Sequence, residues 1–323
     1  MNIKPGIRDF LWMAAGAVVF SAIALIVVHF QTGQSPSDQL AFKARRVDLA
    51  SGMRMSLASA SEAEKSAVLA ITDQDSQIYA DQARTATADV EQKRRELEVL
   101  LTQGGTQREK DLLAQFFPMF SDLQRIDKDL LDLAVRNTNL KASSLAFGPA
   151  ADALKEMDAP LLRLVTKSAS SPDARNVALL AYGTQIAALQ IQTLLAPHIA
   201  EESDAKMDAM EALMTKQDQL VHKDLEDLAA LPDLHGDPDL AAAVAGYAKF
   251  SEIRGRILAL SRENTNVRSL AISLGQKRKM LFLCQDALSA LQQSILEEPI
   301  AGVDYGYPPA PRQLGTEESG KGK

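Results

Sequence analysis

The phrase LAVRNTNLKAS, residues 133–143, returns in altered form as LSRENTNVRSL, residues 260–270. In both places the triplet Asn-Thr-Asn is followed by an aliphatic residue and a basic residue. Because Asn and Thr are common residues, a match of three is close to chance in a chain of this length. The surrounding sequence must therefore distinguish a buried ligand site, a pair of turns and an internal duplication.

Sliding the second half under the first, at an offset of 264 − 137 = 127 in residue number, also aligns the apolar positions around the triplet. Shared apolar faces alone are weak evidence, because every amphipathic helix repeats near 3.6 residues. Faces and triplet together predict two copies of a four-helix unit, with each triplet as the turn from the third helix to the fourth. Upstream, the same offset pairs Asp75 with Glu202 and Ser76 with Ser203. The aligned apolar pairs include Phe120 with Tyr247, Leu123 with Phe250, Ile126 with Ile253, Leu154 with Leu281 and Leu161 with Leu288.

The composition is typical of long packed helices: 46% hydrophobic, 5% aromatic and 24% charged residues. From residue 37 onward the apolar positions recur at steps of three and four, and the alternation of strands is missing. We therefore predict an all-α fold with two tandem four-helix units, 30–167 and 173–297, joined by a linker at 168–172 and stacked into an elongated rod. A single core shared by all eight helices is the alternative. The predicted helices are 37–72, 75–102, 107–138, 146–167, 173–197, 200–229, 238–265 and 269–297.

The stretch FLWMAAGAVVFSAIALIVV, residues 10–28, carries no charge. As a helix it is about 28 Å long, close to the hydrocarbon thickness of a bilayer. It predicts a transmembrane helix at 10–29, and a cleaved signal peptide is disfavoured because the apolar run is long and lacks an Ala-x-Ala-like site. Lys4 and Arg8 place residues 1–9 in the cytoplasm. The expected protein is a single-pass protein of the bacterial inner membrane, with the bulk of its chain in the periplasm.

Several classes of function are disfavoured by what the sequence lacks. The formal charge is −7 and basic residues alternate with acidic ones, so no nucleic-acid partner is expected. The single cysteine, Cys284, excludes an intrachain disulfide, and the four histidines show no metal-ligand spacing. No phosphate loop, nucleophile elbow or zinc-protease motif occurs. We therefore expect no enzyme activity, no metal and no cofactor.

The stretch RVDLASGMRMSLASASEAEKSAVLAITDQDSQIYADQA, residues 46–83, resembles the opening of the extracytoplasmic four-helix-bundle sensory domain of methyl-accepting chemotaxis proteins. LLAQFFPMFSDLQRIDKDLLDLAVRNTN, residues 112–139, resembles the third helix of that domain. The resemblance covers one predicted four-helix unit, or both units with the duplication, and it implies a helical sensory bundle in tandem duplicate. Chemoreceptors continue through a second membrane helix into a signalling module, which this sequence does not display.

The shorter piece ASGMRMSL, residues 50–57, resembles the anion-binding helix of nitrate and nitrite sensor kinases and of pilus chemoreceptors. In those families an arginine from each protomer of a dimer contacts the anion. Ala50, Arg54 and Met55 match the pattern, so the resemblance implies that Arg54 is an anion-binding residue. The alternative is an exposed helical arginine. At the offset of 127 the second copy carries Ala181, so it would lack this site.

The segment 298–323 is predicted to be an extended or disordered tail, because its prolines cannot continue a helix. Within it, Tyr305, Tyr307, Pro308 and Pro309 are candidates for docking on a partner. We expect a non-catalytic accessory or scaffold subunit of a membrane complex, in contact with the bilayer and with a protein partner or a second copy. A chemoreceptor-like module that senses a small anion and signals through a partner is the alternative.

Overall fold

The structure is a computed structural model that describes residues 35–300, and within that range it is all-α, with no strand. Two of its six helices are long and bent, with about 60 residues each. The predicted membrane span and the tail residues Tyr305, Tyr307, Pro308 and Pro309 lie outside the described residues. The segments are α2 (Pro36–Leu69), α3 (Asp73–Gly104), α4 (Gln107–Ala134), α5 (Thr138–Leu145), η1 (Ala146–Ala150), α6 (Ala151–Lys167), α7 (Ala174–Ala200), α8 (Asp204–Ala229), η2 (Pro232–Leu234), α9 (Pro238–Glu263), α10 (Thr265–Ile272), η3 (Ser273–Lys277) and α11 (Arg278–Glu297).

Short polar residues fix where the first helices start. The side chain of Thr72 accepts a hydrogen bond from the backbone of Asp75 at the start of α3. Thr106 and Glu109 form a reciprocal capping box at the start of α4. Such caps satisfy N–H groups that have no partner in the first turn of a helix. These two helices begin within two residues of their predicted starts at 75 and 107.

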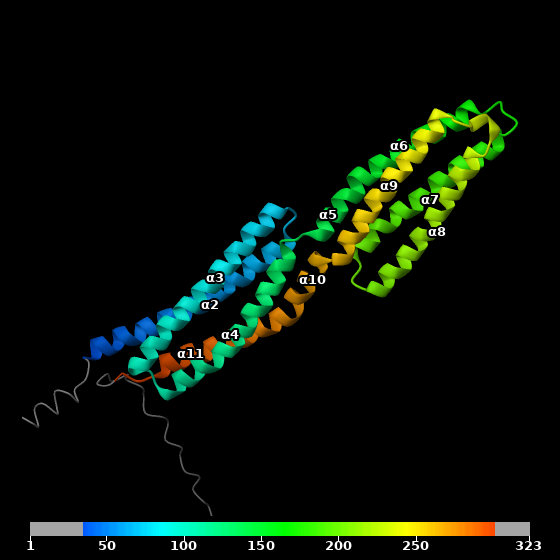
Figure 1. The fold of residues 1–323 in the computed structure, drawn as a ribbon. Helices are drawn as coiled ribbons and strands as arrows, with labels where there is room; N and C mark the ends of the chain where they lie inside the picture. Colours follow the sequence, from blue (N-terminus) through cyan, green and yellow to red (C-terminus); the bar gives the residue numbers. More distant parts are fainter. Residues whose placement is uncertain (1–34, 301–323) are drawn as a thin grey trace, which may run out of the picture.

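The chain does not turn back at either Asn-Thr-Asn triplet. Asn137 and Asn264 take left-handed backbone conformations, with φ of 50° and 53°, and the next residue of each triplet starts another helix. The long bent helices are therefore α4–α5–η1–α6 and α9–α10–η3–α11, and each continues past its triplet (Figure 1). The prediction of a reversing turn between helix 107–138 and helix 146–167 was wrong, because residues 138–150 are helical. One left-handed asparagine bends a helix without reversing it, because the next residue resumes the helical conformation.

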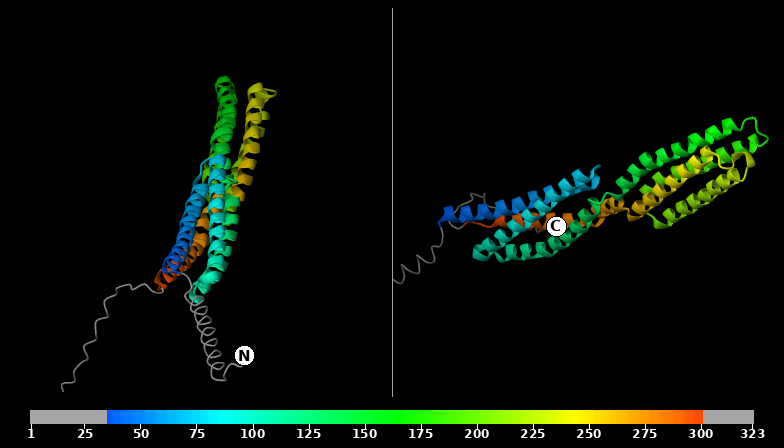
Figure 2. Two further views of the ribbon diagram at one scale, coloured as in Figure 1. Left: turned by 90° about the vertical axis from the view of Figure 1, so that its left-hand side faces the viewer. Right: turned by 45° about the horizontal axis from the view of Figure 1, so that its top comes forward.

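This continuation changes how the helices group. The proximal bundle, which contains both ends of the described chain, consists of α2, α3, α4 and α10–η3–α11. The distal bundle consists of α5–η1–α6, α7, α8 and α9. Figures 1 and 2 show the bundles end to end, joined by the two long helices. The packing thus differs from the expected units 30–167 and 173–297, since the last helix of each expected unit packs in the other bundle.

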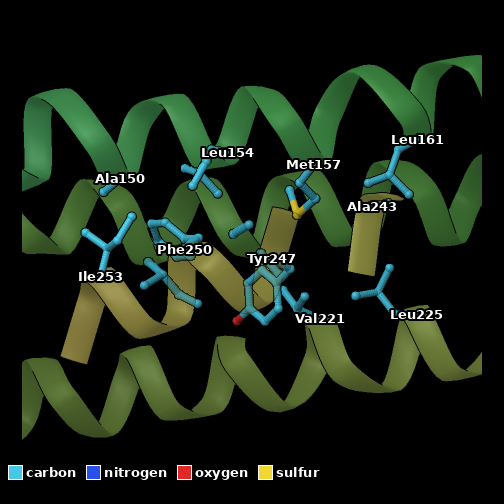
Figure 3. Packing of buried hydrophobic residues seen from close by; sticks show 14 of the residues in the cluster. Ala150, Leu154, Met157, Leu161, Val221, Leu225, Ala243, Tyr247, Phe250 and Ile253 are labelled. Atoms are coloured by element: carbon cyan, nitrogen blue, oxygen red, sulfur yellow. The ribbon is translucent and has the colours of Figure 1, made fainter. Parts of the chain in front are cut away.

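Each bundle has its own apolar core. The distal core is one cluster from all four helical segments, with Tyr247 and Phe250 of α9 between α6 and α8 (Figure 3). α6 and α9 approach closely at Gly246, where an added Cβ would lie 2.7 Å from the backbone nitrogen of Met157. The proximal core consists of two clusters, one nearer the chain ends and one nearer the triplets.

Gly246 and Gly255 lie on the same helix and should respond to alanine with opposite signs. Gly246→Ala is expected to lower the free energy of unfolding by about 1–3 kcal/mol, because the new methyl group overlaps the backbone of α6. Apart from the backbone of its own helix turns and its chain neighbours, no atom of the described chain lies within 4 Å of the Cβ position at Gly255. There alanine should add up to about 1 kcal/mol through helix propensity. Urea unfolding of the two variants measures the difference, and a stabilising effect of Gly246→Ala would contradict the close approach.

The two triplets cap each other where the long helices pass between the bundles. The hydroxyl of Thr265 accepts a hydrogen bond from the backbone N–H of Thr138 at 3.1 Å, and the hydroxyl of Thr138 accepts one from Thr265 at 3.1 Å. The side-chain oxygens of Asn139 and Asn266 likewise accept from each other's backbone N–H groups, both at 3.1 Å. The first two N–H groups of α5 are therefore satisfied by α10, and those of α10 by α5.

The asparagine amides complete this reciprocal junction. Asn139 donates its side-chain N–H to Oδ1 of Asn264 at 2.7 Å, and Asn266 donates to Oδ1 of Asn137 at 2.9 Å. Asn139 also donates to the backbone oxygen of Ile199 at 2.6 Å. Each triplet therefore caps the helix that begins at the other triplet. Their joint role is to hold the two bundles together.

Corresponding helices start 127 residues apart when they follow the triplets, but not when they precede them. α5 and α10 begin at an offset of 265 − 138 = 127, and the π-helical segments η1 and η3 begin at an offset of 273 − 146 = 127. The caps of α3 and α8 are instead Thr72 and Ser203, at an offset of 203 − 72 = 131. The upstream pairing of Ser76 with Ser203 was therefore wrong by about one helical turn.

Candidate functional site

A buried polar layer divides the two apolar clusters of the proximal core. Lys277, the last residue of η3, is 2% exposed, and its ammonium donates to Glu64 Oε2 at 2.6 Å and to Ser61 Oγ at 2.9 Å. Glu64 is fully buried, and its other oxygen, Oε1, has no hydrogen-bond partner within residues 35–300. An ion pair so deeply buried stabilises little on balance, but breaking it leaves an uncompensated charge.

Asp127 of α4 belongs to the same layer. Burial raises the pKa of its carboxyl to about 6, while the positive charge of Lys277 acts in the opposite direction and Glu64 raises the pKa further. Its Oδ1 has no hydrogen-bond partner in the described part of the chain. Cys284 lies nearby on α11, and burial together with the charge of Asp127 raises its pKa to about 12. A thiol so reluctant to ionise is a poor nucleophile, so Cys284 acts as a small core residue.

Asp127→Asn should change the dependence of stability on pH. The carboxyl titrates near 4 in the unfolded chain and near 6 when folded, so between these values the folded state holds more protons and stability falls as pH rises. Asparagine cannot ionise, so the variant avoids the loss of unfolding free energy caused by the charged carboxylate, which at neutral pH is about 2–3 kcal/mol. The variant's advantage in urea unfolding should be absent at pH 4 and complete by pH 7. Asp129→Asn, an exposed change on the same helix, is the control. A pH-independent difference would contradict the buried carboxyl.

Two residues of this polar layer also line an open groove between α2 and η3–α11. The groove has a volume of about 840 Å³, and both Lys277 and Ser61 line it. Lys65 and Arg278 stand on opposite sides and form no ion pair with any residue of 35–300, although the guanidinium of Arg278 lies over the ring of Phe282. The apolar lining includes exposed side chains that a solitary bundle would be expected to cover: Leu69 (68% exposed), Leu274 (60%) and Phe282 (52%).

Arg54 lies on a continuation of this groove toward the chain ends. The adjoining hollow, of about 640 Å³, is lined by Arg54, Met55 and Gln292 and shares Phe282 with the main groove. The guanidinium of Arg54 donates to Gln292 Oε1 at 2.7 Å and is exposed to solvent. Its charge therefore has a neutral partner and an open approach. Arg54 is placed where an anion can reach it, but without the burial that makes a guanidinium depend on one.

Under the predicted duplication, the counterpart of Arg54 in the distal bundle depends on the offset that is used. At the offset of 127 it is Ala181, which is buried in the distal core. The helix caps give an offset of 131, which selects Gln185 instead. Gln185 is uncharged and donates to the backbone oxygen of Asp158 at 3.4 Å. In either register the distal bundle has no arginine at this place.

A second ion cluster ties the end of α11 to the start of α2. Arg46, 2% exposed, donates to Glu109 Oε2 at 2.5 Å and to the carboxylate of Glu298. Lys43 donates to the backbone oxygens of Leu296 and Glu298 at 2.7 and 2.5 Å. Burial raises the pKa of Glu109, and Arg46 opposes that shift. These contacts fix the two ends of the described chain side by side at the base of the proximal bundle.

One buried cluster has the sequence of hydrogen bonds found in a catalytic triad, but substrate cannot reach its serine hydroxyl. His198 Nδ1 lies 2.8 Å from Ser261 Oγ, and its Nε2 lies 2.9 Å from Glu211 Oε1. Ser261 and His198 are both fully buried, and Ser261 donates to the backbone oxygen of His198 at 3.0 Å. A nucleophile needs an open face for its substrate. This cluster therefore joins α7, α8 and α9 rather than presenting a reactive hydroxyl.

Sequence reasoning singled out Arg54 but did not single out Lys277, Glu64 or Asp127. A signal was present, because Lys277 lies at the helical spacing of the core residues Leu281 and Cys284. A charged residue on an apolar stripe indicates a buried partner. The partners themselves lie on α2 and α4, far from Lys277 in the sequence, and no local pattern connects them. Comparison of the chain with protein-family models, curated proteins and solved structures finds no match.

Proposed function

We propose that this protein is a non-catalytic scaffold subunit, anchored in the bacterial inner membrane by residues 10–29, that docks a helix of a partner protein in the groove between α2 and α11. The observation that carries the proposal is the groove itself, where exposed Leu69, Leu274 and Phe282 stand beside two cations, Lys65 and Arg278, that form no ion pair within residues 35–300. Apolar and charged side chains along two adjacent helices fit the two faces of an amphipathic helix.

The arrangement of the chain ends supports the same proposal. α2 begins and α11 ends at the base of the proximal bundle, and the distal bundle lies at the opposite end (Figure 2). An anchor that precedes residue 35 would therefore leave the distal bundle projecting away from it. α7 is the one helix among residues 35–300 that is long and apolar enough to cross a membrane. It packs in the distal bundle core, so the proposed span is the N-terminal stretch.

The test places a photo-crosslinking residue at Phe282 in the full chain in its membrane. We expect an adduct of discrete mass that differs from two copies of the 35.0 kDa chain, with the crosslink mapped to a helical segment of one partner. The matched control is Leu213 of α8, which is also 52% exposed. Purified partner and chain should then bind each other, with an affinity that Phe282→Glu lowers at least about tenfold and Leu213→Glu does not. Equal effects of the two variants would refute the groove.

A sensor of small anions is the second candidate, favoured by the exposed guanidinium of Arg54 with its neutral partner Gln292. If Arg54 binds an anion, nitrate at about 100 times its Kd should stabilise the protein by about 2.7 kcal/mol. Arg54→Gln should abolish that gain, while Arg125→Gln, an exposed change on α4, should keep it. Thermal unfolding with nitrate and with chloride measures the effect. Equal melting temperatures in the two salts would remove this candidate.

A further inference from the structure

The outer face of α7 carries a stripe that no other part of the described chain covers. Its positions follow one another at steps of 3, 4, 3, 4 and 3, and the larger side chains are strongly exposed: Leu179 is 62% exposed, Ile186 58% and Leu189 58%. The α7 stripe consists of Leu179, Tyr182, Ile186, Leu189, Thr193 and Ala196. The opposite face of α7 packs into the distal core through residues such as Ile191 and Leu195.

The spacing of the stripe indicates what covers it. Alternating steps of three and four place side chains on a seam with a repeat of about 3.5 residues, the repeat by which two helices pack along their length. The face that a helix buries in a globular bundle is wider than such a seam. α7 already buries a face of that kind in the distal core, on the side opposite the stripe. The occupant of the stripe is therefore a helix.

The charge around the stripe selects which helix. Residues 176–197 of α7 contain no Asp, Glu, Lys, Arg or His. Elsewhere the helix surfaces carry ion pairs, such as Arg95 with Glu91 on α3 and Lys223 with Asp227 on α8. Charges that flank a seam set the choice of partner, and a helix with charged flanks would leave them unpaired against α7. A second copy of α7 has no charged side chain between residues 176 and 197, so it would leave no charge unpaired.

We propose that the α7 stripe packs in parallel against the α7 stripe of a second copy of this chain, forming a twofold dimer through the distal bundles. A twofold contact uses the same surface on both subunits, which suits an uncharged seam that is its own complement. The parallel direction rests on the proposed membrane anchor, because two chains anchored in one membrane point the same way. The dimer surface lies on a different bundle from the groove proposed for the partner protein.

The oligomeric state of the full chain in detergent tests the dimer. We expect sedimentation to give a protein mass of twice 35.0 kDa. Ile186→Glu should weaken association by about a hundredfold or more, since the dimer would bury two unpaired carboxylates. Leu213→Glu on α8 is the matched control and should leave the mass unchanged. A monomeric wild-type chain, or an Ile186→Glu variant that remains dimeric, would overturn the proposal.

Cysteine crosslinking in the membrane tests the direction and the occupant. Leu179→Cys should form a disulfide between two chains on mild oxidation, whereas the wild type, whose Cys284 is buried, should not. A disulfide that forms between Leu179→Cys and Ala196→Cys chains, and not between two Leu179→Cys chains, would overturn the parallel arrangement.

The same variants test what occupies the α7 stripe. An adduct to a different protein would replace the second copy as occupant. Protection of the stripe by lipid vesicles, with no dimer, would assign it to the bilayer. Failure of the Phe282 crosslink leaves all of these results unaffected.

Discussion

Lys277→Met is expected to destabilise the folded chain by about 3–5 kcal/mol. Glu64 is fully buried, and this ammonium is its one ion-pair partner among the described residues. Without it, the carboxylate must stay charged in the bundle interior without a compensating cation, or bind a proton there, and either costs free energy. Domains are stable by about 5–15 kcal/mol, so this one change removes much of the total. Urea unfolding at neutral pH provides the measurement.

Two further variants separate the loss of the ion pair from a general effect of substitution. Lys279→Met removes an exposed lysine two residues away on α11 and should change stability by no more than about 0.5 kcal/mol. The double variant Lys277→Met/Glu64→Leu should recover most of the loss, because an apolar pair replaces the ion pair. If Lys277→Met unfolds the chain, the recovery in the double variant still decides the matter. A double variant less stable than the single one would show that Lys277 acts through other contacts.

Thr138→Val/Thr265→Val is expected to destabilise the chain by about 2–6 kcal/mol, or about 1–3 kcal/mol for each of two buried donors that lose their acceptors. Valine keeps the shape of threonine but removes the hydroxyl oxygens that accept from the backbone N–H groups of the opposite helix. Hydrogen exchange should show the loss of protection first at the starts of α5 and α10, where the caps are removed. Urea unfolding measures the total change.

The control for the junction is Thr138→Ser/Thr265→Ser. Serine keeps both hydroxyls and loses one methyl group at each site, so this variant should be more stable than the valine variant. The single variants should couple, because Thr138 and Thr265 contact each other at 3.2 Å between their hydroxyls. Equal stabilities of the serine and valine variants would show that the reciprocal caps contribute nothing.

The positions of the helices could be predicted from the sequence because their causes are local. Capping residues and apolar spacing place α3 and α4 within a few residues of their observed limits. The junction could not be predicted in this way. An Asn-Thr-Asn triplet offers the same side chains to a turn and to a bend, and contacts with the distant second triplet decide between them. The grouping of helices into bundles followed from that one decision.

The candidate site shows the same division. The charge and exposure of Arg54 follow from its own helix, so a short local motif was enough to single it out. Lys277 is buried because η3 directs it into the proximal bundle, where α2 supplies Glu64 and α4 supplies Asp127. Three segments distant in sequence create that layer, and it becomes recognisable only when the helices have been assembled.

The interleaved grouping of the helices has a consequence for how the chain is made. During synthesis from the N-terminus, α2, α3 and α4 emerge before the distal bundle, but the fourth wall of their own bundle, residues 265–297, emerges after it. The distal bundle can close as soon as residue 263 is available. Until residues 265–297 follow, the apolar faces of α2 and α4 that pack against α11 lack that cover. The proximal bundle therefore closes last, and its unfinished apolar surface is exposed for longer during synthesis than that of the distal bundle.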